Sequence, residues 1–377
     1  MTPPFIVVLY ACSGSRGHQA LAENYCELLL SAGINAIAVD VLALDSHRRF
    51  SGFVTVYFWL LHKMPWLWRW LYQNWSNVPG INWYRQRMLP RQFRRTRHLL
   101  MMTAPELVLS THPVSTAAAD HLKRVGKLKA PLWVAISDWH TQPFWLFPSV
   151  DRYLVPTNSQ HLDLERTGVP KNKMTVVGML LRRAYYKPTD RNSARAHLKV
   201  PAGSHLIVVM GGGSGWGLEN IIEALTRLES RLIVIAGSKE RQMQIQLYMR
   251  KSAFDKAAEV LGYVDPLPYL IASDLVVTKP GALSTAEVLH LRRPLILTEP
   301  MPGHEEENSR ILSTFGICCA TTSEELVQLA RAVLNNGGTV EGGILRVESI
   351  CCDATPQLVL NNIRQALDRR LEMIGVQ

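Results

Sequence analysis

Two segments of this chain begin in the same way, and together they limit its fold more than any other feature. Each is an apolar, β-rich run, followed by a glycine cluster and then by a helical pattern. The first starts at Phe5 and reaches Gly17, and the second starts at Leu206 and continues through 211–217, about 200 residues later. A strand, a glycine turn and a helix open doubly wound α/β domains. Two such openings in 377 residues predict two domains of ordinary size.

Short apolar runs alternate with helical patterns after each opening, which is typical of parallel sheets covered by helices. The predicted strands are 35–40, 107–110, 132–137 and 152–155 in the first half, and 232–236, 259–263, 275–278, 295–298 and 317–320 in the second. We therefore expect an α/β fold with two Rossmann-like, doubly wound domains that face each other across a cleft. The expected segments are 1–187, 188–354 and a C-terminal helix within 355–377 that returns to the first domain.

The stretch 46–105 contains no Asp or Glu, but it holds nine Arg, one Lys and thirteen aromatic residues, six of them Trp. Its charge of +10 equals the formal net charge of the whole chain. Basic side chains interleaved with Trp suit an anionic lipid surface or a nucleic-acid backbone. No RRM, KH or zinc pattern accompanies the charge, so lipid is favoured, although a solvated basic face over a core helix stays open. The predicted membrane-binding residues are Trp59, Trp66, Trp68, Trp70, Trp75, Arg87, Arg91, Arg94 and Arg95.

No segment predicts a membrane-spanning helix, because the most apolar run, 52–61, has about half of the roughly 20 residues required. The run 5–12 is interpreted as a buried strand and not as a signal peptide, since no Lys or Arg precedes it. The six cysteines form no CxxC pair and have no His at ligand spacing, which argues against zinc. No Asp-x-Asp metal site stands out either, so we expect no metal and no cofactor. These observations favour a cytoplasmic protein bound peripherally to the inner face of the cell membrane.

The second half carries polar motifs at turns where doubly wound domains bind ligands. The glycines in 211–217 lack the Lys-Ser/Thr ending of a P-loop, which argues against an ATPase, but their backbone N–H groups suit a diphosphate. Glu287 follows the turn at Gly281 and suits a ribose diol; alternatively, Ser284 caps the helix and Glu287 completes a capping box. The run 302–308 suits sugar hydroxyls, unless its three Glu only complement a helix dipole.

The order of these motifs resembles the donor half of the diacylglycerol glycosyltransferases. The matching motifs are GYVDPL from Gly262, SDLVVTKPG from Ser273 and PGHEEEN from Pro302, preceded in the first half by the turn at Gly17 and His18, THP from Thr111, ISDWH from Ile136 and VDRY from Val150. The family includes plant monogalactosyldiacylglycerol synthases and bacterial processive diacylglycerol glucosyltransferases, and it is related to the enzyme that adds N-acetylglucosamine to lipid I. The resemblance implies a GT-B fold, a UDP-galactose or UDP-glucose donor, a diacylglycerol acceptor and inversion of the anomeric carbon.

The resemblance also implies roles for single residues. Gly212, Gly213 and Ser214 would lie against the diphosphate, and the backbone near Val264 would lie against uracil. Glu287 would contact the ribose, and His304 with Glu305 would contact the sugar. The rest of the donor set is Gly281, Ser284, Thr285 and Asn308, and the residues that would face the acceptor are Gly17 and His112. Three positions depart from the family pattern. Ser13 stands where plant enzymes have Asp, Gln142 where bacterial relatives have His, and His304 where many relatives have Gln. The last departure leaves galactose versus glucose open.

An inverting transfer needs a base for the acceptor hydroxyl and stabilisation of the charge on the departing UDP. We rank His18 first, because an unperturbed histidine has a pKa near 6.5, and then Asp138 and His140. Each residue could instead have a purely structural role. His18 could form a hydrogen bond to the loop at the start of its helix, His112 could pack or bond to the backbone, and Asp138 could cap a loop. Alternative functions are a UDP-N-acetylglucosamine transferase with a polyprenyl-linked acceptor, a soluble UDP-sugar epimerase and a basic adaptor without catalysis.

Overall fold

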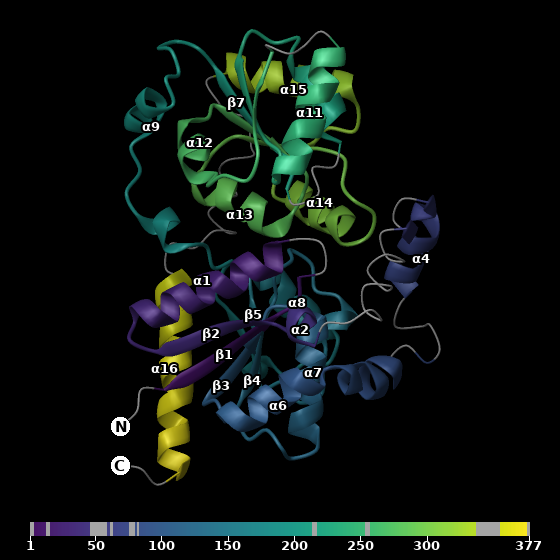
Figure 1. The fold of residues 1–377 in the computed structure, drawn as a ribbon, viewed down its shortest axis with the longest axis vertical. Coiled ribbons are helices and arrows are strands. Elements are labelled where there is room, and N and C mark those ends of the chain that lie inside the picture. The colour runs from purple at the N-terminus through teal and green to yellow at the C-terminus, as the bar shows by residue number, and fades with distance from the viewer. Residues whose placement is uncertain are drawn as a thin grey trace. The chain divides into compact units, whose positions relative to one another are not determined.

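The chain divides into two compact units (Figure 1), which are Met1–Arg183 with Cys352–Gln377, and Ala184–Cys351. The computed structural model describes residues 4–12, 16–45, 59–60, 63–74, 80, 83–212, 217–252, 257–336 and 355–374. The C-terminal segment joins the first unit, as the sequence predicted. The change of unit falls after residue 183, four residues before the expected end of the first domain at 187.

Within its described residues, the first unit forms a six-stranded parallel sheet in the order β2-β1-β3-β4-β5-β6. The strands are β1 (Phe5–Tyr10), β2 (Asn35–Asp40), β3 (Leu107–Ser110), β4 (Leu132–Ala135), β5 (Arg152–Val155) and β6 (Met174–Val176). The sequence predicted all of them except β6, a three-residue edge strand in which only Met174 is buried. The chain leaves β1 for β2 on one side and β3 on the other, which creates a switch point of the kind where doubly wound folds bind ligands.

Both faces of this sheet are buried. Successive side chains along β1 point to opposite faces, and residues of both sets are buried. Val7 and Leu9 belong to a core shared with the alanines of α7 (Pro113–Arg124), whereas the fully buried Ile6 and Val8 point to the opposite face. The helix α1 (Gly17–Ser31) packs on β1 and β2. Figure 1 shows the yellow α16 (Thr355–Ile374) beside the purple α1, and the two helices are in contact. A segment from the far end of the chain thus completes the first unit.

Asp45, the last acid before the acid-free stretch, reaches the helix that ends the stretch, α6 (Arg94–Thr103). Its two carboxylate oxygens accept hydrogen bonds from the backbone N–H groups of Arg95 (2.6 Å) and Thr96 (2.8 Å). These N–H groups have no partner inside the helix, so Asp45 caps it from outside and ties the two ends of the stretch together. The other described helices of this unit are α2 (Val41–Leu44), α4 (Pro65–Asn74), α8 (Asn158–Arg166), the π-helix η2 (Tyr84–Met88), and the short 3-10 helices η3 (Leu89–Gln92), η4 (Pro143–Trp145) and η5 (Lys171–Lys173).

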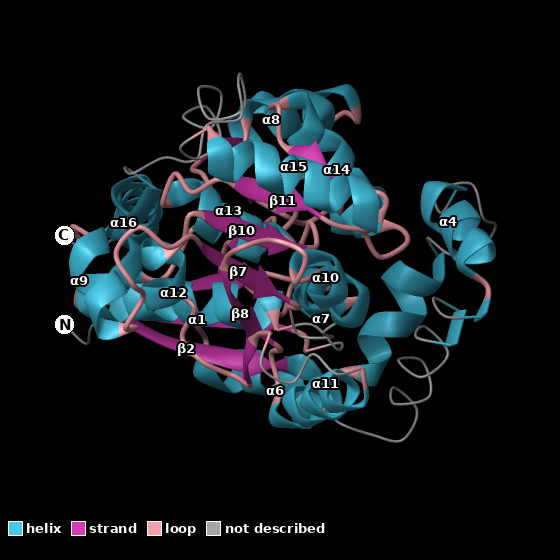
Figure 2. Ribbon diagram, turned by 90° about the horizontal axis from the view of Figure 1, so that it is seen from above, coloured by secondary structure: helices cyan, strands magenta, loops and turns pink. Residues whose placement is uncertain are grey.

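In the part of the second unit that the structure describes, six parallel strands run in the order β12-β11-β10-β7-β8-β9. They are β7 (Leu206–Met210), β8 (Arg231–Ile235), β9 (Glu259–Leu261), β10 (Leu275–Thr278), β11 (Leu295–Leu297) and β12 (Cys318–Cys319), and all lie within or beside their predicted ranges. The helices that flank them (Figure 2) are α9 (Arg191–His197), α10 (Leu218–Leu225), α11 (Lys239–Lys251), α12 (Leu267–Ala272), α13 (Ala282–His290), α14 (His304–Thr314) and α15 (Ser323–Asn335), after the 3-10 turn η6 (Arg183–Tyr186). The expected α/β GT-B architecture is therefore confirmed as two doubly wound sheets.

Asp274, at the start of β10, joins α9 to the sheet of the second unit. Its carboxylate accepts hydrogen bonds from the Leu206 backbone N–H (2.8 Å) and the Arg195 guanidinium (2.9 Å), and it also pairs with Arg191. Burial raises the pKa of this carboxyl, but the Leu206 N–H and the two guanidinium groups outweigh burial, so the pKa lies below its usual value. The folded state therefore holds Asp274 ionised at neutral pH.

We expect Asp274→Asn to lower the free energy of unfolding by about 2–4 kcal/mol, because two guanidinium groups lose their carboxylate. Asp163→Asn breaks an exposed pair with Arg166 and should cost less than about 1 kcal/mol. Denaturant unfolding of both variants at pH 7 measures the difference.

The Asp274→Asn deficit should also depend on pH. Because the folded-state pKa is below that of the unfolded chain, the carboxylate stabilises the fold above the unfolded pKa, and this contribution is lost as the pH falls through the folded pKa. The deficit should therefore shrink between about pH 5 and pH 3. A deficit that stayed constant over this range would contradict the account.

Candidate functional site

Three loops of the first unit meet around His18. His18 lies in the first turn of α1, next to Gly17, and the carboxyl ends of β3 and β4 carry the other two loops. The Nδ1 atom of His18 lies 2.9 Å from the Thr111 carbonyl oxygen and 2.8 Å from the Ser137 hydroxyl. Carboxyl ends of parallel strands share one edge of a sheet, which is why residues about 120 apart in the chain meet here.

These contacts determine which nitrogen of His18 carries the proton. A carbonyl oxygen can only accept, so the bond to Thr111 requires a proton on Nδ1, and this N–H is shared between the Thr111 carbonyl and the oxygen of the Ser137 hydroxyl. The Thr111 hydroxyl in turn donates to the His18 carbonyl at 3.0 Å, which fixes the backbone beside the ring. In neutral His18 the basic lone pair is therefore on Nε2. A base held in one tautomer by a third group is the arrangement that general-base chemistry requires.

His112 packs its ring edge-to-face on His18, with the ring centroids 4.4 Å apart. It is the N-cap of α7, and its Nδ1 accepts the Val114 backbone N–H at 3.0 Å. Burial, together with the nearby His18, lowers the pKa of His112 well below its usual value, so this ring is neutral. The sequence left packing or backbone bonding open as the role of His112. In the structure, His112 accepts a backbone N–H and its ring packs on that of His18.

The other candidate bases follow β4 on the same loop as Ser137. The side chain of Gln160 in α8 donates to the Asp138 backbone carbonyl at 2.7 Å, which anchors this loop. Asp138 and His140 are both partly buried. Trp145 of η4 is buried, and its ring centroid is 6.2 Å from that of His18. Ser137 was missed as a site residue, although it stands in the ISDWH motif beside Asp138.

The glycine loop of the second unit follows β7. Gly212 has a φ of +60°, and Gly217 is the N-cap of α10 with a φ of +70°. The positive φ of Gly212 favours glycine there, and a Cβ added to it would lie 2.8 Å from Cε of Lys279 and displace the end of that side chain. Two predicted diphosphate residues, Gly213 and Ser214, lie outside the described residues.

Lys279 is the residue that the sequence reading left without a role, although it stands in the SDLVVTKPG motif. Its Nζ lies 2.5 Å from Oε1 of Glu305, and the two side chains are 11% and 3% exposed. The second oxygen of Glu305 accepts the Met301 backbone N–H at 2.9 Å. Glu305 was expected to read sugar hydroxyls, but in this structure both of its oxygens are used inside the protein.

The first turns of α13 and α14 differ from the sequence-based expectation. The N-cap of α13 is Gly281, so Ser284 is the third helical residue and the alternative in which Ser284 caps the helix is wrong. Thr285 is buried, and its hydroxyl donates to the Gly281 carbonyl at 2.8 Å. Asn308 of α14 donates to the Pro280 carbonyl at 3.2 Å, so it joins two turns. The expected donor residues that stay partly exposed are Gly212, Val264, Gly281, Ser284, Glu287 and His304.

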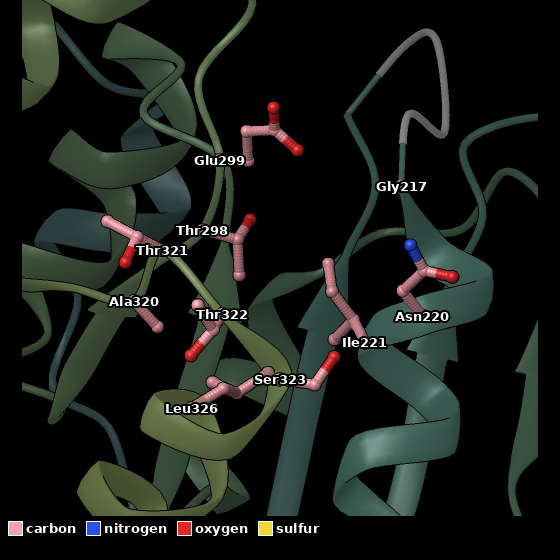
Figure 3. A pocket seen from close by; sticks show the side chains of 10 residues that line it. All are labelled: Gly217, Asn220, Ile221, Thr298, Glu299, Ala320, Thr321, Thr322, Ser323 and Leu326. Carbon is pink, nitrogen blue, oxygen red and sulfur yellow. The ribbon is translucent and has the colours of Figure 1, made fainter.

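A pocket of about 100 Å³ lies near the start of α10 and the ends of β11 and β12 (Figure 3). It is lined by Gly217, Asn220, Ile221, Thr298, Glu299, Ala320, Thr321, Thr322, Ser323 and Leu326. None of the predicted donor residues belongs to this set, and sites for drug-sized ligands usually measure about 300–1,000 Å³. The predicted donor residues therefore lie outside this pocket, on the glycine loop and on the turns after β9, β10 and β11.

The first unit has a larger groove, of about 430 Å³, between η4 and the turn that precedes β6. Its lining is mostly apolar and includes Leu146, Phe147, Val150 and Val169. Gln86 of η2 also lines it, so the groove borders the acid-free stretch.

The helix α4 of the acid-free stretch begins at Pro65, and its aromatic residues divide between two sides. Trp66 and Trp70 are 63% and 52% exposed, whereas Tyr72 is 9% exposed and its ring centroid lies 6.0 Å from that of Phe144. Trp68 packs on Tyr72, with the ring centroids 6.3 Å apart. The other described residues of the predicted lipid-binding set, Trp59, Arg87, Arg91, Arg94 and Arg95, are exposed, and Trp75 lies outside the described residues. No helix in the described ranges is both long and apolar enough to cross a bilayer.

The sequence comparisons assign a domain to each unit. The family profile described as monogalactosyldiacylglycerol (MGDG) synthase matches residues 18–180, and the glycosyltransferase family 28 C-terminal domain matches residues 206–336. A processive diacylglycerol beta-glucosyltransferase of Bacillus cereus (strain B4264) is 26% identical over 316 residues, covering 81% of this chain and 79% of that protein. The two matches have the order that the motifs predicted.

Solved structures support the fold independently. MurG of Acinetobacter baumannii aligns with a TM-score of 0.61 at 15% identity, covering 96% of this chain and 100% of that one. Anabaena Alr3699/HepE in complex with UDP-glucose aligns with a TM-score of 0.59 at 13% identity, covering 96% and 99%. At these identities the likeness concerns the fold alone.

The glycine loop yields a test that is independent of function. Gly212→Ala should lower the free energy of unfolding by about 1–3 kcal/mol, because alanine tolerates a φ of +60° poorly, and its Cβ would also displace Lys279. Gly281→Ala is the control, since Gly281 has a φ of −69° and no heavy atom within 4 Å of its added Cβ. Chemical unfolding compares the two. Equal losses would show that the loop imposes no special demand.

Proposed function

We propose that the chain, whose two units match the MGDG synthase and glycosyltransferase family 28 C-terminal profiles, is a diacylglycerol glycosyltransferase. It would transfer glucose or galactose from a UDP-sugar to the hydroxyl of diacylglycerol at a membrane surface, which makes a glycolipid. The observation that carries the proposal is the fixed tautomer of His18, whose Nδ1 is held by Thr111 and Ser137. We further propose that the protein acts at the inner face of the cell membrane, on the cytoplasmic side.

The proposed step is a single displacement with inversion. The acceptor oxygen forms a bond to C1 of the sugar, the bond between C1 and the β-phosphate oxygen breaks, and its electron pair leaves with UDP. The proton of the acceptor hydroxyl passes to Nε2 of His18, the nitrogen that carries the lone pair. His18 ranks before Asp138 and His140, because its contacts with Thr111 and Ser137 hold its Nδ1 and direct Nε2 to the acceptor.

On the donor side, the proposed contacts come from the turns after β7, β9, β10 and β11. The loop from Gly212 faces the diphosphate, the backbone near Val264 the uracil, Glu287 the ribose and His304 the sugar. Backbone N–H groups and the N-terminal end of a helix attract anions, which suits the charge that develops on UDP. We expect no metal or other cofactor in this step.

The acceptor side is supported by the position of α4. Its exposed Trp66 and Trp70 suit the headgroup level of an anionic bilayer, where amphipathic rings gather. Tyr72 on the inner side packs on Phe144 of η4, and Trp145 of the same η4 lies beside His18. The mostly apolar groove next to η4 suits an acyl chain. A solvated basic face does not require such exposed Trp side chains.

The alternatives have less support. A UDP-N-acetylglucosamine transferase with a polyprenyl-linked acceptor would share the fold, but the profile that matches the first unit is that of MGDG synthase. A soluble epimerase needs no exposed Trp helix. A basic adaptor without catalysis needs no base held in one tautomer.

The proposal is tested with UDP-glucose, UDP-galactose and UDP-N-acetylglucosamine, each offered to diacylglycerol, monoglycosyl diacylglycerol and a polyprenyl acceptor in anionic vesicles. The wild type should form glycosyl diacylglycerol, and His18→Ala should lower kcat about 10²- to 10⁴-fold, since a general base contributes this much. UDP affinity should change less than about twofold, because His18 contacts no donor group in this account.

Replacement of the exposed His197, His197→Ala, is the control and should leave kcat unchanged. Absence of a glycolipid product with every donor would refute the transferase proposal. Normal turnover of the His18 variant would remove His18 from the mechanism.

Membrane binding is tested by co-sedimentation with vesicles that contain anionic phospholipid. Trp66→Ser/Trp70→Ser should lower the partition coefficient for vesicles at least about tenfold, because two large apolar surfaces are lost. Met243→Ser/Leu247→Ser is the matched control, since these α11 side chains are 55% and 54% exposed in the second unit. If both double variants bound vesicles as the wild type does, α4 would not be the docking element.

A further inference from the structure

Lys279 occupies an unusual place for a cation. It follows β10, and its Cε lies 2.8 Å from the position of a Cβ built on Gly212, the second glycine of the loop after β7. Only 11% of its side chain is exposed. The chain therefore places a nearly buried ammonium group directly against the loop to which the donor diphosphate is assigned.

Glu305 holds this ammonium group in place. Its Oε1 lies 2.5 Å from Nζ, and its Oε2 is fixed by the Met301 backbone N–H. Met301 also contributes its Sδ, at 3.4 Å from Nζ. Glu305 and Met301 use two of the three N–H donors of the ammonium, and among the described residues no partner takes the third.

A buried ion pair is weak evidence for stability, since the loss of hydration can exceed the Coulomb attraction. An uncharged pair of similar volume would fill the same space at no greater cost. A buried lysine beside a loop that suits an anion is better explained by a ligand that brings negative charge. A diphosphate leaving group does so, and its charge rises as the bond to the sugar breaks.

We propose that Lys279 binds the diphosphate of the UDP-sugar donor through its third N–H, and that Glu305 is the positioning residue that holds Lys279 on the glycine loop. This rests on the proposed UDP-sugar donor and replaces the sugar-reading role expected for Glu305. Lys279 stabilises the negative charge on the departing UDP, while Glu305 does not touch the sugar.

The experiment compares two variants that differ only in the lysine, Glu305→Gln and Lys279→Met/Glu305→Gln. The double variant removes both buried charges, so neither is left alone. Calorimetry measures the affinities for UDP and for uridine. The ratio of the two affinities should fall about 10- to 100-fold from the single to the double variant, as expected for a charge-assisted hydrogen bond, while uridine affinity stays the same.

An equal ratio in the two variants would overturn the proposal. Glu305→Gln should bind UDP-glucose and UDP with unchanged relative affinity, and a selective loss of UDP-glucose would restore the sugar-reading role. If the double variant fails to fold, Lys279→Gln takes its place against the wild type; loss of folding there too would make the pair structural and overturn the proposal.

These outcomes are separate from those of the transferase proposal. The wild type could bind UDP more tightly than uridine through Lys279 and still form no glycolipid. This result would refute the proposed transferase reaction and would support the diphosphate site. A wild type with no preference for UDP over uridine would overturn the diphosphate site.

Discussion

The parallel pairing of β1 with β3 and of β3 with β4 is the constraint on which the first site depends. The pairing aligns Leu9 with Ser110 and Ser110 with Val134, so that the three strands end at one edge. The chain must leave each strand there, and the turns that follow bring His18, Thr111 and Ser137 into hydrogen-bonding distance. Because the sheet is buried on both faces, this edge is fixed by the core, and the tautomer of His18 follows from it.

The same constraint acts in the second unit with a different outcome. β10 lies between β7 and β11, so the turns after these strands adjoin. They contribute Gly212, Lys279 and Glu305, which form a glycine loop with a buried ammonium group against it. Fixed dipoles and one anchored cation do not have to reorganise when charge develops, which is the general advantage of a preorganised site. The two units thus hold different groups: the first has His18 with its Nδ1 against Thr111 and Ser137, and the second has a buried ammonium group beside the glycine loop.

The sequence predicted most of the strands, because buried parallel strands appear as apolar runs between turn residues. It missed β6, whose three residues form no apolar run. It also misjudged how several site side chains are used. The start of α13 lies at Gly281 and not at Ser284, and each residue of shift turns a side chain by about 100° around the helix axis. Glu305 pairs with a lysine 26 positions earlier, a contact that no local spacing encodes. His18 was ranked first on its chemistry alone, and the structure adds the carbonyl that fixes its tautomer.

The transfer we propose is a single displacement at the anomeric carbon, with His18 as the base. The most direct test is the configuration of the product, read by NMR from the anomeric proton of the glycolipid formed from diacylglycerol and UDP-glucose or UDP-galactose. Because the sugar of either donor is α-linked, a single displacement predicts a β-linked glycolipid. An α-linked product would require retention and would contradict the account.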